Sequence, residues 1–289
     1  MAKGIIMKGI GGLYLVKTDD GVWECRARGI FRKDKITPMI GDFVEVSFGE
    51  TNTIDEILPR KNSLVRPPLA NIDQLVIIVA TIDPSPSTMI IDKLIAIAEN
   101  KGIEPILVLN KLDLANADEL LAIYSQAGFT VVCMNDSNSI QILKKALTDK
   151  VSAFTGNSGV GKSTILNLIN ADLGLAVGET SKKLGRGRHT TRHVELFELE
   201  GGGFVADTPG FSSVDIEQYE VILKDDLQYS FREFLPHIEH CKYTGCSHTK
   251  EKGCAILELV KKGEIGENRH HNYCAIYESV KDLREWEFK

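Results

Sequence analysis

The chain has no hydrophobic run long enough to cross a membrane. Its longest apolar stretch, residues 75–82, is far shorter than the about 20 residues that a membrane-spanning helix needs. The sequence also does not open with a sustained apolar segment and a small-residue cleavage site, which is the pattern of a secretory signal. We therefore expect a cytoplasmic protein with no membrane partner.

An excess of positive charge is absent too. The 34 Lys and Arg residues are outnumbered by 40 Asp and Glu residues, which gives a formal net charge of −6. Because proteins bind nucleic acids through clustered Lys and Arg side chains at the phosphates, an RNA-binding role has to rest on local basic patches. The densest patch lies in residues 182–192.

Cysteines are few, and their placement favours metal binding over disulfide bonds. Three of the six lie within residues 241–254, together with a histidine. Three thiolates and one imidazole suit a closed tetrahedral Zn²⁺ site with a structural role. We expect one such ion per chain, held by Cys241, Cys246, His248 and Cys254. The other three cysteines have no such neighbours and are predicted to be packing residues.

Hydrophobic periodicity predicts three domains. In residues 1–66 apolar and polar side chains alternate, which is typical of strands in a small OB-like β-barrel, with a turn at Asp19–Gly21 between the first two strands. Residues 67–215 alternate between strand-like and helical patterns, which predicts a P-loop α/β domain with a mostly parallel sheet. Residues 216–289 are polar, with helices expected at Ala255–Lys262 and Tyr273–Trp286. Their apolar content is low, so we expect an α-rich domain stabilised by zinc.

A phosphate-binding loop is the strongest motif in the α/β domain. Residues 156–163 read GNSGVGKS between a predicted strand and a predicted helix, and they fit the pattern G-x-x-x-x-G-K-[ST]. In such loops backbone N–H groups and the helix N-terminus bind phosphate oxygens, the lysine neutralises the β- and γ-phosphates, and the serine binds Mg²⁺. We assign nucleotide binding to Gly156, Asn157, Ser158, Gly159, Val160, Gly161, Lys162, Ser163 and Thr164.

Two further motifs predict that the nucleotide is GTP or GDP. Residues 207–210 read DTPG, so that Asp207 suits a second Mg²⁺ contact and the Gly210 N–H suits the γ-phosphate. Residues 110–113 read NKLD, which adds Asn110, Lys111 and Asp113 to the site. A carboxylate at Asp113 can accept two hydrogen bonds from the N1–H and 2-amino groups of guanine, and adenine lacks that edge.

The order of these motifs is unusual. An ordinary GTPase runs from the phosphate loop through a switch threonine and D-x-x-G to N-K-x-D, whereas here N-K-x-D comes first. This order matches a circular permutation, which keeps the sheet and moves the chain ends. It also attaches the C-terminal region directly after the D-T-P-G segment.

The basic patch lies where a first nucleotide-sensing loop belongs. Either Thr190 or Thr191 could bind Mg²⁺ and sense the γ-phosphate, and we place Thr191 in the catalytic set with Lys162, Asp207 and Gly210. Phe211 stands where small GTPases often carry a glutamine that orients the attacking water. His189 is the first candidate to replace that glutamine, and we expect slow hydrolysis without a partner.

Together these features resemble one family, the circularly permuted bacterial GTPases called ribosome small subunit-dependent GTPase A. The resemblance rests on the barrel-like N-terminus, on the order NKLD, GNSGVGKS, GRGRHTT and DTPGF, and on the Cys/His cluster. It implies an OB domain, a permuted GTPase domain and a zinc domain. It also implies a GTP hydrolase that is stimulated by the small (30S) ribosomal subunit, binds its rRNA and acts in late 30S maturation. A monomer is expected.

Two other functions stay open at this point. The chain could be a nucleotide-gated binding module in which hydrolysis is incidental, or a metal-handling GTPase that delivers zinc. The closed four-ligand spacing argues against delivery, because labile sites need an accessible geometry.

Overall fold

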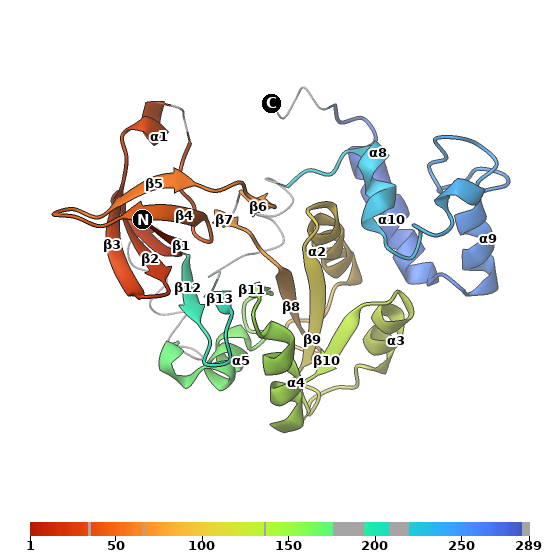
Figure 1. The fold of residues 1–289 in the computed structure, drawn as a ribbon. Coiled ribbons are helices and arrows are strands. Elements are labelled where there is room, and N and C mark those ends of the chain that lie inside the picture. The colour runs from red at the N-terminus through yellow and green to blue at the C-terminus, as the bar shows by residue number, and fades with distance from the viewer. Residues whose placement is uncertain (34–35, 66, 136, 176–193, 208–219, 285–289) are drawn as a thin grey trace.

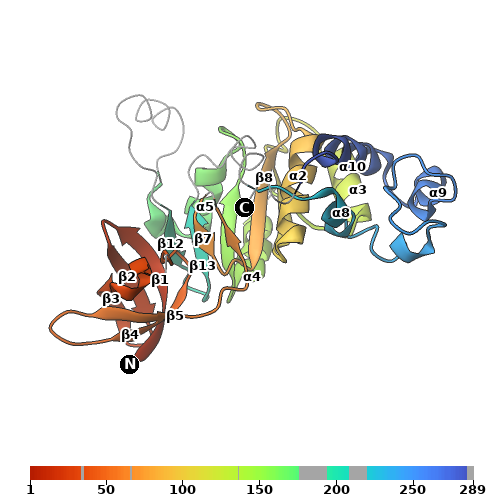
Figure 2. The ribbon, with the colours of Figure 1, turned by 90° about the horizontal axis from the view of Figure 1, so that it is seen from above.

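The computed structural model describes residues 1–33, 36–65, 67–135, 137–175, 194–207 and 220–284 of the 289-residue chain. Three parts follow one another along the molecule: an N-terminal barrel, a central sheet with helices, and a C-terminal group of helices beside α2 (Figures 1 and 2). Within the described residues no helix is both long and apolar enough to span a bilayer.

The N-terminal barrel is closed and has the strand order β1-β2-β3-β5-β4. Its interior is apolar, because alternate side chains such as Ile6, Val16, Val44 and Ile54 are completely buried. The fold class predicted from the alternating pattern is therefore confirmed. The strands are β1 (Ala2–Ile10), β2 (Leu13–Thr18), β3 (Gly21–Ala27), β4 (Phe43–Ser47) and β5 (Thr53–Ile57), with the short helix α1 (Ile30–Lys33) after β3.

One detail of the barrel prediction was wrong. The turn at residues 19–20 was expected to join the first two strands. It joins β2 to β3, because the chain already forms β1 before it. The register of β1 against β2 shifts between Ile6 and Lys8. Such a bulge breaks the period-two alternation by which a strand is recognised.

The central sheet has six strands in the order β10-β9-β8-β11-β13-β12, all parallel except β12. Every residue of β8 and β11 is buried, as expected for strands covered on both faces. The strands are β8 (Gln74–Ala80), β9 (Glu104–Asn110), β10 (Thr130–Cys133), β11 (Val151–Thr155), β12 (Glu195–Glu198) and β13 (Phe204–Asp207).

Helices cover the two faces of this sheet. The apolar sides of α2 (Thr88–Asn100) and α3 (Asp118–Gln126) belong to one core cluster, and those of α4 (Ser137–Leu147) and α5 (Lys162–Ile169) belong to another. The parallel strands end at one edge of the sheet, which is where α/β folds bind ligands.

Polar contacts join the barrel to the outer edge of the sheet. Lys8 on β1 forms an ion pair with Glu195 at 2.6 Å, and Lys17 on β2 pairs with Glu198 at 2.8 Å. Both carboxylates lie on β12. Between barrel and sheet the chain forms a small two-stranded sheet of β6 (Ser63–Leu64) and β7 (Leu69–Ala70).

The C-terminal region packs on α2 rather than around a core of its own. Phe231, Phe234, Tyr273 and Ile276 are buried in the same cluster as the apolar side of α2. The C-terminal region has few apolar residues of its own, and it is stabilised by the core that it shares with α2. The elements here are α8 (Lys224–Leu227), the 3₁₀ turns η2 (Gln228–Ser230) and η3 (Ile238–His240), α9 (Ala255–Lys262) and α10 (Glu267–Val280); a further 3₁₀ turn, η1 (Ala171–Leu173), follows α5.

The prediction for the last helix was displaced: α10 begins six residues before Tyr273 and ends at Val280. Its first turns are polar, yet Arg269 is only 1% exposed and bonds to Asp92 of α2 at 2.6 Å and to Glu233 at 2.8 Å. Asn272 also donates to Asp92. The first turns of α10 are buried by ion pairs and not by apolar side chains, so they show no hydrophobic periodicity. The prediction from hydropathy therefore began the helix too late.

Candidate functional sites

The phosphate loop connects β11 to α5, and its glycines are required by space and by backbone conformation. Gly159 and Gly161 have φ values of 88° and 95°, which favour glycine. A Cβ atom on Gly161 would lie 2.3 Å from Asn110 Nδ2, and one on Gly156 would lie 2.6 Å from the Ile78 carbonyl oxygen. The loop therefore sits directly against the ends of β8 and β9.

The N-K-L-D segment contacts this loop. Asn110, the last residue of β9, donates from Nδ2 to the Val160 carbonyl oxygen at 2.8 Å. Lys111 has a φ of 61°, its carbonyl accepts from Thr81 Oγ1 at 2.7 Å, and its Nζ donates to the Asp83 carbonyl. The structure thus brings together two motifs that lie 50 residues apart in the sequence.

A surface hollow lies beside Asp113. Its lining includes Leu112, Asp113, Leu114, Cys133 and Asn135, so that it joins the segment after β9 to the segment after β10. Asp113 is exposed there, as a carboxylate that receives a base from solvent must be. Sequence reasoning assigned no role to a residue after β10, and the structure adds Cys133 and Asn135 to the lining. The position of residues 133–135 directly after a strand of the sheet was a usable signal, and the adjacency of β9 and β10 brings them beside Asp113.

Asp113→Asn is expected to weaken GTP binding by on the order of 10²- to 10³-fold and to shift the preference toward xanthine nucleotides. The amide N–H₂ of asparagine would face the N1–H and 2-amino donors of guanine. The two hydrogen bonds that these groups donate to the Asp113 carboxylate would therefore be weakened or lost. Equilibrium binding of GTP and XTP measures the change. Asp118→Asn is the matched control, because Asp118 lines the same hollow without belonging to the motif. Unchanged GTP preference in Asp113→Asn would refute the assignment.

The remaining predicted nucleotide residues lie at the same edge of the sheet. Lys162, Ser163 and Thr164 form the first turn of α5, with Lys162 and Ser163 half-buried. Asn157 is half-buried, and Ser158 is exposed. Asp207 ends β13, which pairs with β11 beside the phosphate loop. The side chain of Asp207 and residues His189, Thr190, Thr191, Gly210 and Phe211 lie outside the described part of the chain.

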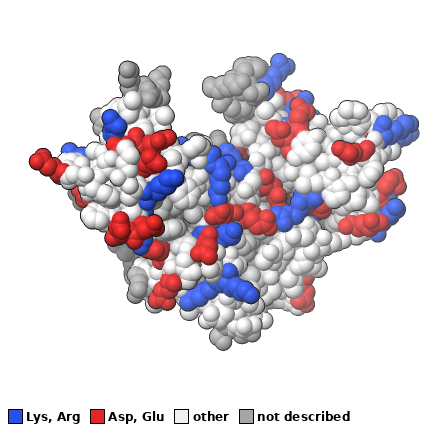
Figure 3. Space-filling model, viewed as in Figure 1, with Lys and Arg blue, Asp and Glu red and all other residues white. Residues whose placement is uncertain are grey.

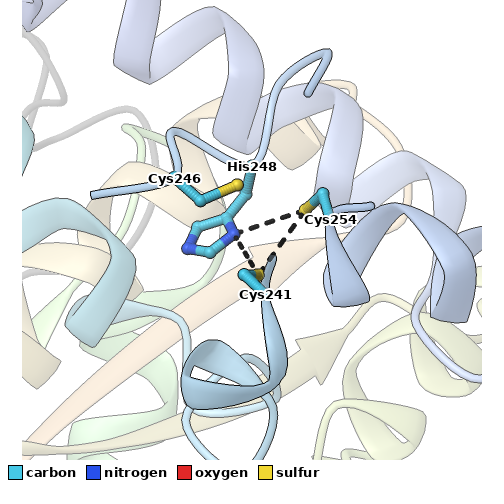
Figure 4. A group of neighbouring side chains, drawn as sticks. All are labelled: Cys241, Cys246, His248 and Cys254. Carbon is cyan, nitrogen blue, oxygen red and sulfur yellow. Dashed lines mark hydrogen bonds between the residues drawn. The ribbon is translucent and has the colours of Figure 1, made fainter. Parts of the chain in front are cut away.

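Cys241, Cys246, His248 and Cys254 form one cluster, as Figure 4 shows, and their ligand atoms all lie within 4.8 Å of one another. His248 Nδ1 is 3.5 Å from the sulfurs of Cys241 and Cys254, which are 3.9 Å apart. Zn–S bonds of about 2.3 Å and Zn–N bonds of about 2.0–2.1 Å at tetrahedral angles place sulfurs about 3.8 Å apart and sulfur about 3.6 Å from nitrogen. The donor set and its spacing therefore fit a tetrahedral metal ion.

Neighbouring groups set the protonation states of these four side chains. The second ring nitrogen of His248, Nε2, lies 2.9 Å from Gln228 Oε1, and donation to this oxygen leaves Nδ1 free of a proton. Burial lowers the pKa of His248, raises that of Cys246 to about 12 and raises that of Cys254. The imidazole is therefore neutral, and a bound cation has to displace the thiol protons, as Zn²⁺ does.

Two supporting residues were missed by sequence reasoning. Gln228 lies 20 residues before its histidine, and no spacing rule links them. Glu251 accepts hydrogen bonds from the backbone N–H groups of Ser247, Thr249 and Lys250, which holds the turn that carries His248. Burial would raise the pKa of Glu251, but hydrogen bonds from the Ser247 hydroxyl and from backbone N–H groups, including those of Ser247 and Lys250, lower it to about 2. An acidic residue within a cysteine-rich turn is a usable signal for such a role.

Comparison with known families and relatives covers the whole chain. A family model described as the RsgA GTPase matches residues 57–217, and one described as the RsgA N-terminal domain matches residues 3–53. A relative from Caldanaerobacter subterraneus subsp. tengcongensis, named small ribosomal subunit biogenesis GTPase RsgA, is 43% identical over 99% of this chain and 98% of its own. A relative of the same name from Ruminiclostridium cellulolyticum is 44% identical over 100% of this chain and 97% of its own.

Solved structures agree with this similarity. The crystal structure of YjeQ from Thermotoga maritima has a TM-score of 0.83 and 33% identity, over 98% of this chain and 99% of that one. The crystal structure of YloQ, described as a circularly permuted GTPase, has a TM-score of 0.81 and 35% identity, over 98% of this chain and 96% of that one. The permuted order of the motifs in this chain thus agrees with its structural similarity to a protein described as a circularly permuted GTPase.

Proposed function

This chain belongs to the RsgA family of circularly permuted GTPases, and on that premise we propose that it hydrolyses GTP to GDP and phosphate. We propose further that the small ribosomal subunit stimulates this reaction in the cytoplasm, and that the protein binds rRNA and acts in late 30S maturation. The names of the relatives support this proposal.

One contact carries the nucleotide assignment. The Asn110 side chain bonds to the Val160 carbonyl, so the segment expected to read the base is attached to the loop expected to bind the phosphates. A nucleotide with its base in the hollow beside Asp113 then has its phosphates directed to the N-terminus of α5. On this proposal the two chemically distinct ends of the nucleotide bind to segments that a hydrogen bond joins.

The proposed roles at the phosphate end follow from position. Lys162 at the first position of α5 neutralises the β- and γ-phosphates, while backbone N–H groups of residues 156–164 bind their oxygens. Ser163, Thr191 and Asp207 are the proposed Mg²⁺ ligands, and the bound ion supplies charge neutralisation at the phosphates. We propose that the Gly210 N–H contacts the γ-phosphate and that His189 orients the attacking water in place of the glutamine that Phe211 replaces.

We propose Zn²⁺ as the ion of the Cys/His cluster and a structural role for it. All four ligands come from the protein, which leaves no open position for catalysis. We place the domains at residues 1–66, 67–215 and 216–289, in a monomer. On the face seen in Figure 3, basic and acidic side chains intermingle, so rRNA binding on that face has to use local clusters.

Steady-state GTP hydrolysis by the intact protein, alone and with purified ribosomal subunits, tests this function. We expect slow turnover alone and an increase of about 10³-fold or more with small subunits, because a partner that completes a GTPase site contributes this much. Large subunits are the matched control and are expected to leave the rate unchanged. Intact GTP binding without stimulation by small subunits would contradict the proposed partner.

A further inference from the structure

An apolar groove lies between α2, α10 and residues 220–222, away from both sites described above. Its volume is about 260 Å³. An apolar cavity of roughly 150 Å³ takes up benzene, so this groove has room for one large aromatic side chain. Seven of its lining residues are apolar: Ala96, Ile97, Val221, Ile222, Ile276, Val280 and Leu283.

The C-terminal tail, residues 285–289, begins beside this groove. Leu283 forms part of the wall, and Trp286 follows it by only three residues, which an extended chain spans with up to about 10 Å. The tail reads EWEFK, so an extended conformation places both aromatic rings on one side and both carboxylates on the other. Two charged residues, Lys93 and Glu220, also line the groove, and Glu220 forms an ion pair with Lys101 at 2.8 Å.

We propose that Trp286 inserts its indole ring into this groove, so that the tail of the chain covers the apolar contact between α2 and α10. An indole buries a large apolar area, and its size matches the space between the walls. Val221 and Ile222 of the wall follow the D-T-P-G segment by about ten residues, so the docked tail packs on the chain downstream of the nucleotide site. This inference does not depend on the proposed GTPase function.

Tryptophan fluorescence tests the docking directly, because the chain has only two tryptophans. Trp23 lies on the barrel, so Trp23→Phe leaves Trp286 as the single reporter. We expect the emission of Trp286 in the folded protein to be blue-shifted relative to the protein unfolded in urea. We also expect acrylamide to quench it several-fold less than in urea. Emission of an exposed indole, with quenching equal to that in urea, would overturn the proposal. Should Trp23→Phe not fold, the difference between the unchanged chain and Trp286→Phe gives the same measurement.

A matched pair of variants on α10 then locates the ring. Val280 lines the groove, whereas Ala275 is exposed on the same helix and lies outside it. Val280→Lys is expected to expose Trp286 to acrylamide, and Ala275→Lys is expected to leave it protected. Protection that persists in Val280→Lys would place the indole elsewhere. Protection that disappears on dilution would mean that the tail docks into a second copy, and it would overturn docking within one chain.

Discussion

Lys162→Ala is expected to reduce GTP hydrolysis by ~10²–10³-fold or more and to weaken nucleotide binding. Removal of one group that stabilises developing charge in a preorganised site costs a factor of this size. Lys162 begins α5 directly after Gly161, whose missing Cβ allows Asn110 to approach the loop. A helix N-terminus and the N–H groups of such a loop already favour anions, so the proposed role of Lys162 is to add a full positive charge there.

Single-turnover hydrolysis of GTP measures the effect on the chemical step, and equilibrium binding of GTP measures the effect on affinity. Lys145→Ala is the matched control, since Lys145 is exposed on α4 and lies in neither nucleotide motif. We expect the control to behave like the unchanged protein. Hydrolysis at the normal rate in Lys162→Ala would refute the assignment of residues 156–163 as the phosphate loop.

Cys246→Ser is expected to release the metal ion and to loosen the turn at residues 241–254. A structural zinc site contributes an apparent ~10–16 kcal/mol of binding free energy near neutral pH, and this energy orders the ligand-bearing segment. The loss should remain local. The ion pair of Arg269 with Asp92 joins α10 to α2 without involving a cluster ligand, and Phe231 and Phe234 are buried in the shared core.

Metal content and limited proteolysis with trypsin measure this result. New cleavage is expected at Lys242, Lys250 and Lys252, which lie within or beside the turn, while α10 stays protected. Cys274→Ser is the matched control, because Cys274 is a half-buried cysteine outside the cluster. Unchanged zinc content together with unchanged proteolysis would show that the four residues do not form the metal site.

The motifs that define both candidate sites could be recognised in the sequence because each motif is short and continuous. A run such as GNSGVGKS determines a turn and a helix start within a few residues, and Gly159 and Gly161 adopt the positive φ values that the turn requires. The Cys/His cluster is similar, since its four ligands lie within residues 241–254. Predictions that depended on hydrophobic periodicity were less accurate where the pattern was interrupted, as at the bulge of β1 and at the polar start of α10.

The supporting contacts could not be predicted, because they join residues that are distant along the chain. The NKLD motif assigned Asn110 to the site, and only the adjacency of β9, β8 and β11 brings its side chain to the Val160 carbonyl. Gln228 is likewise one of several amides near the cluster, and packing on α2 brings it to His248. The barrel contacts on β12 arise in the same way, from strand order rather than from any local pattern.

By itself the sequence determined the fold class, the permuted order of the nucleotide motifs and the four residues of the metal cluster, because these follow from local backbone and ligand chemistry. Only the tertiary structure decided how these parts support one another. Arg269 and Asp92 are 177 residues apart, and nothing in the sequence around either residue indicates that they pair. Burial makes their pairing necessary, since an unpaired charge in the core is costly, and burial is a property of the folded chain.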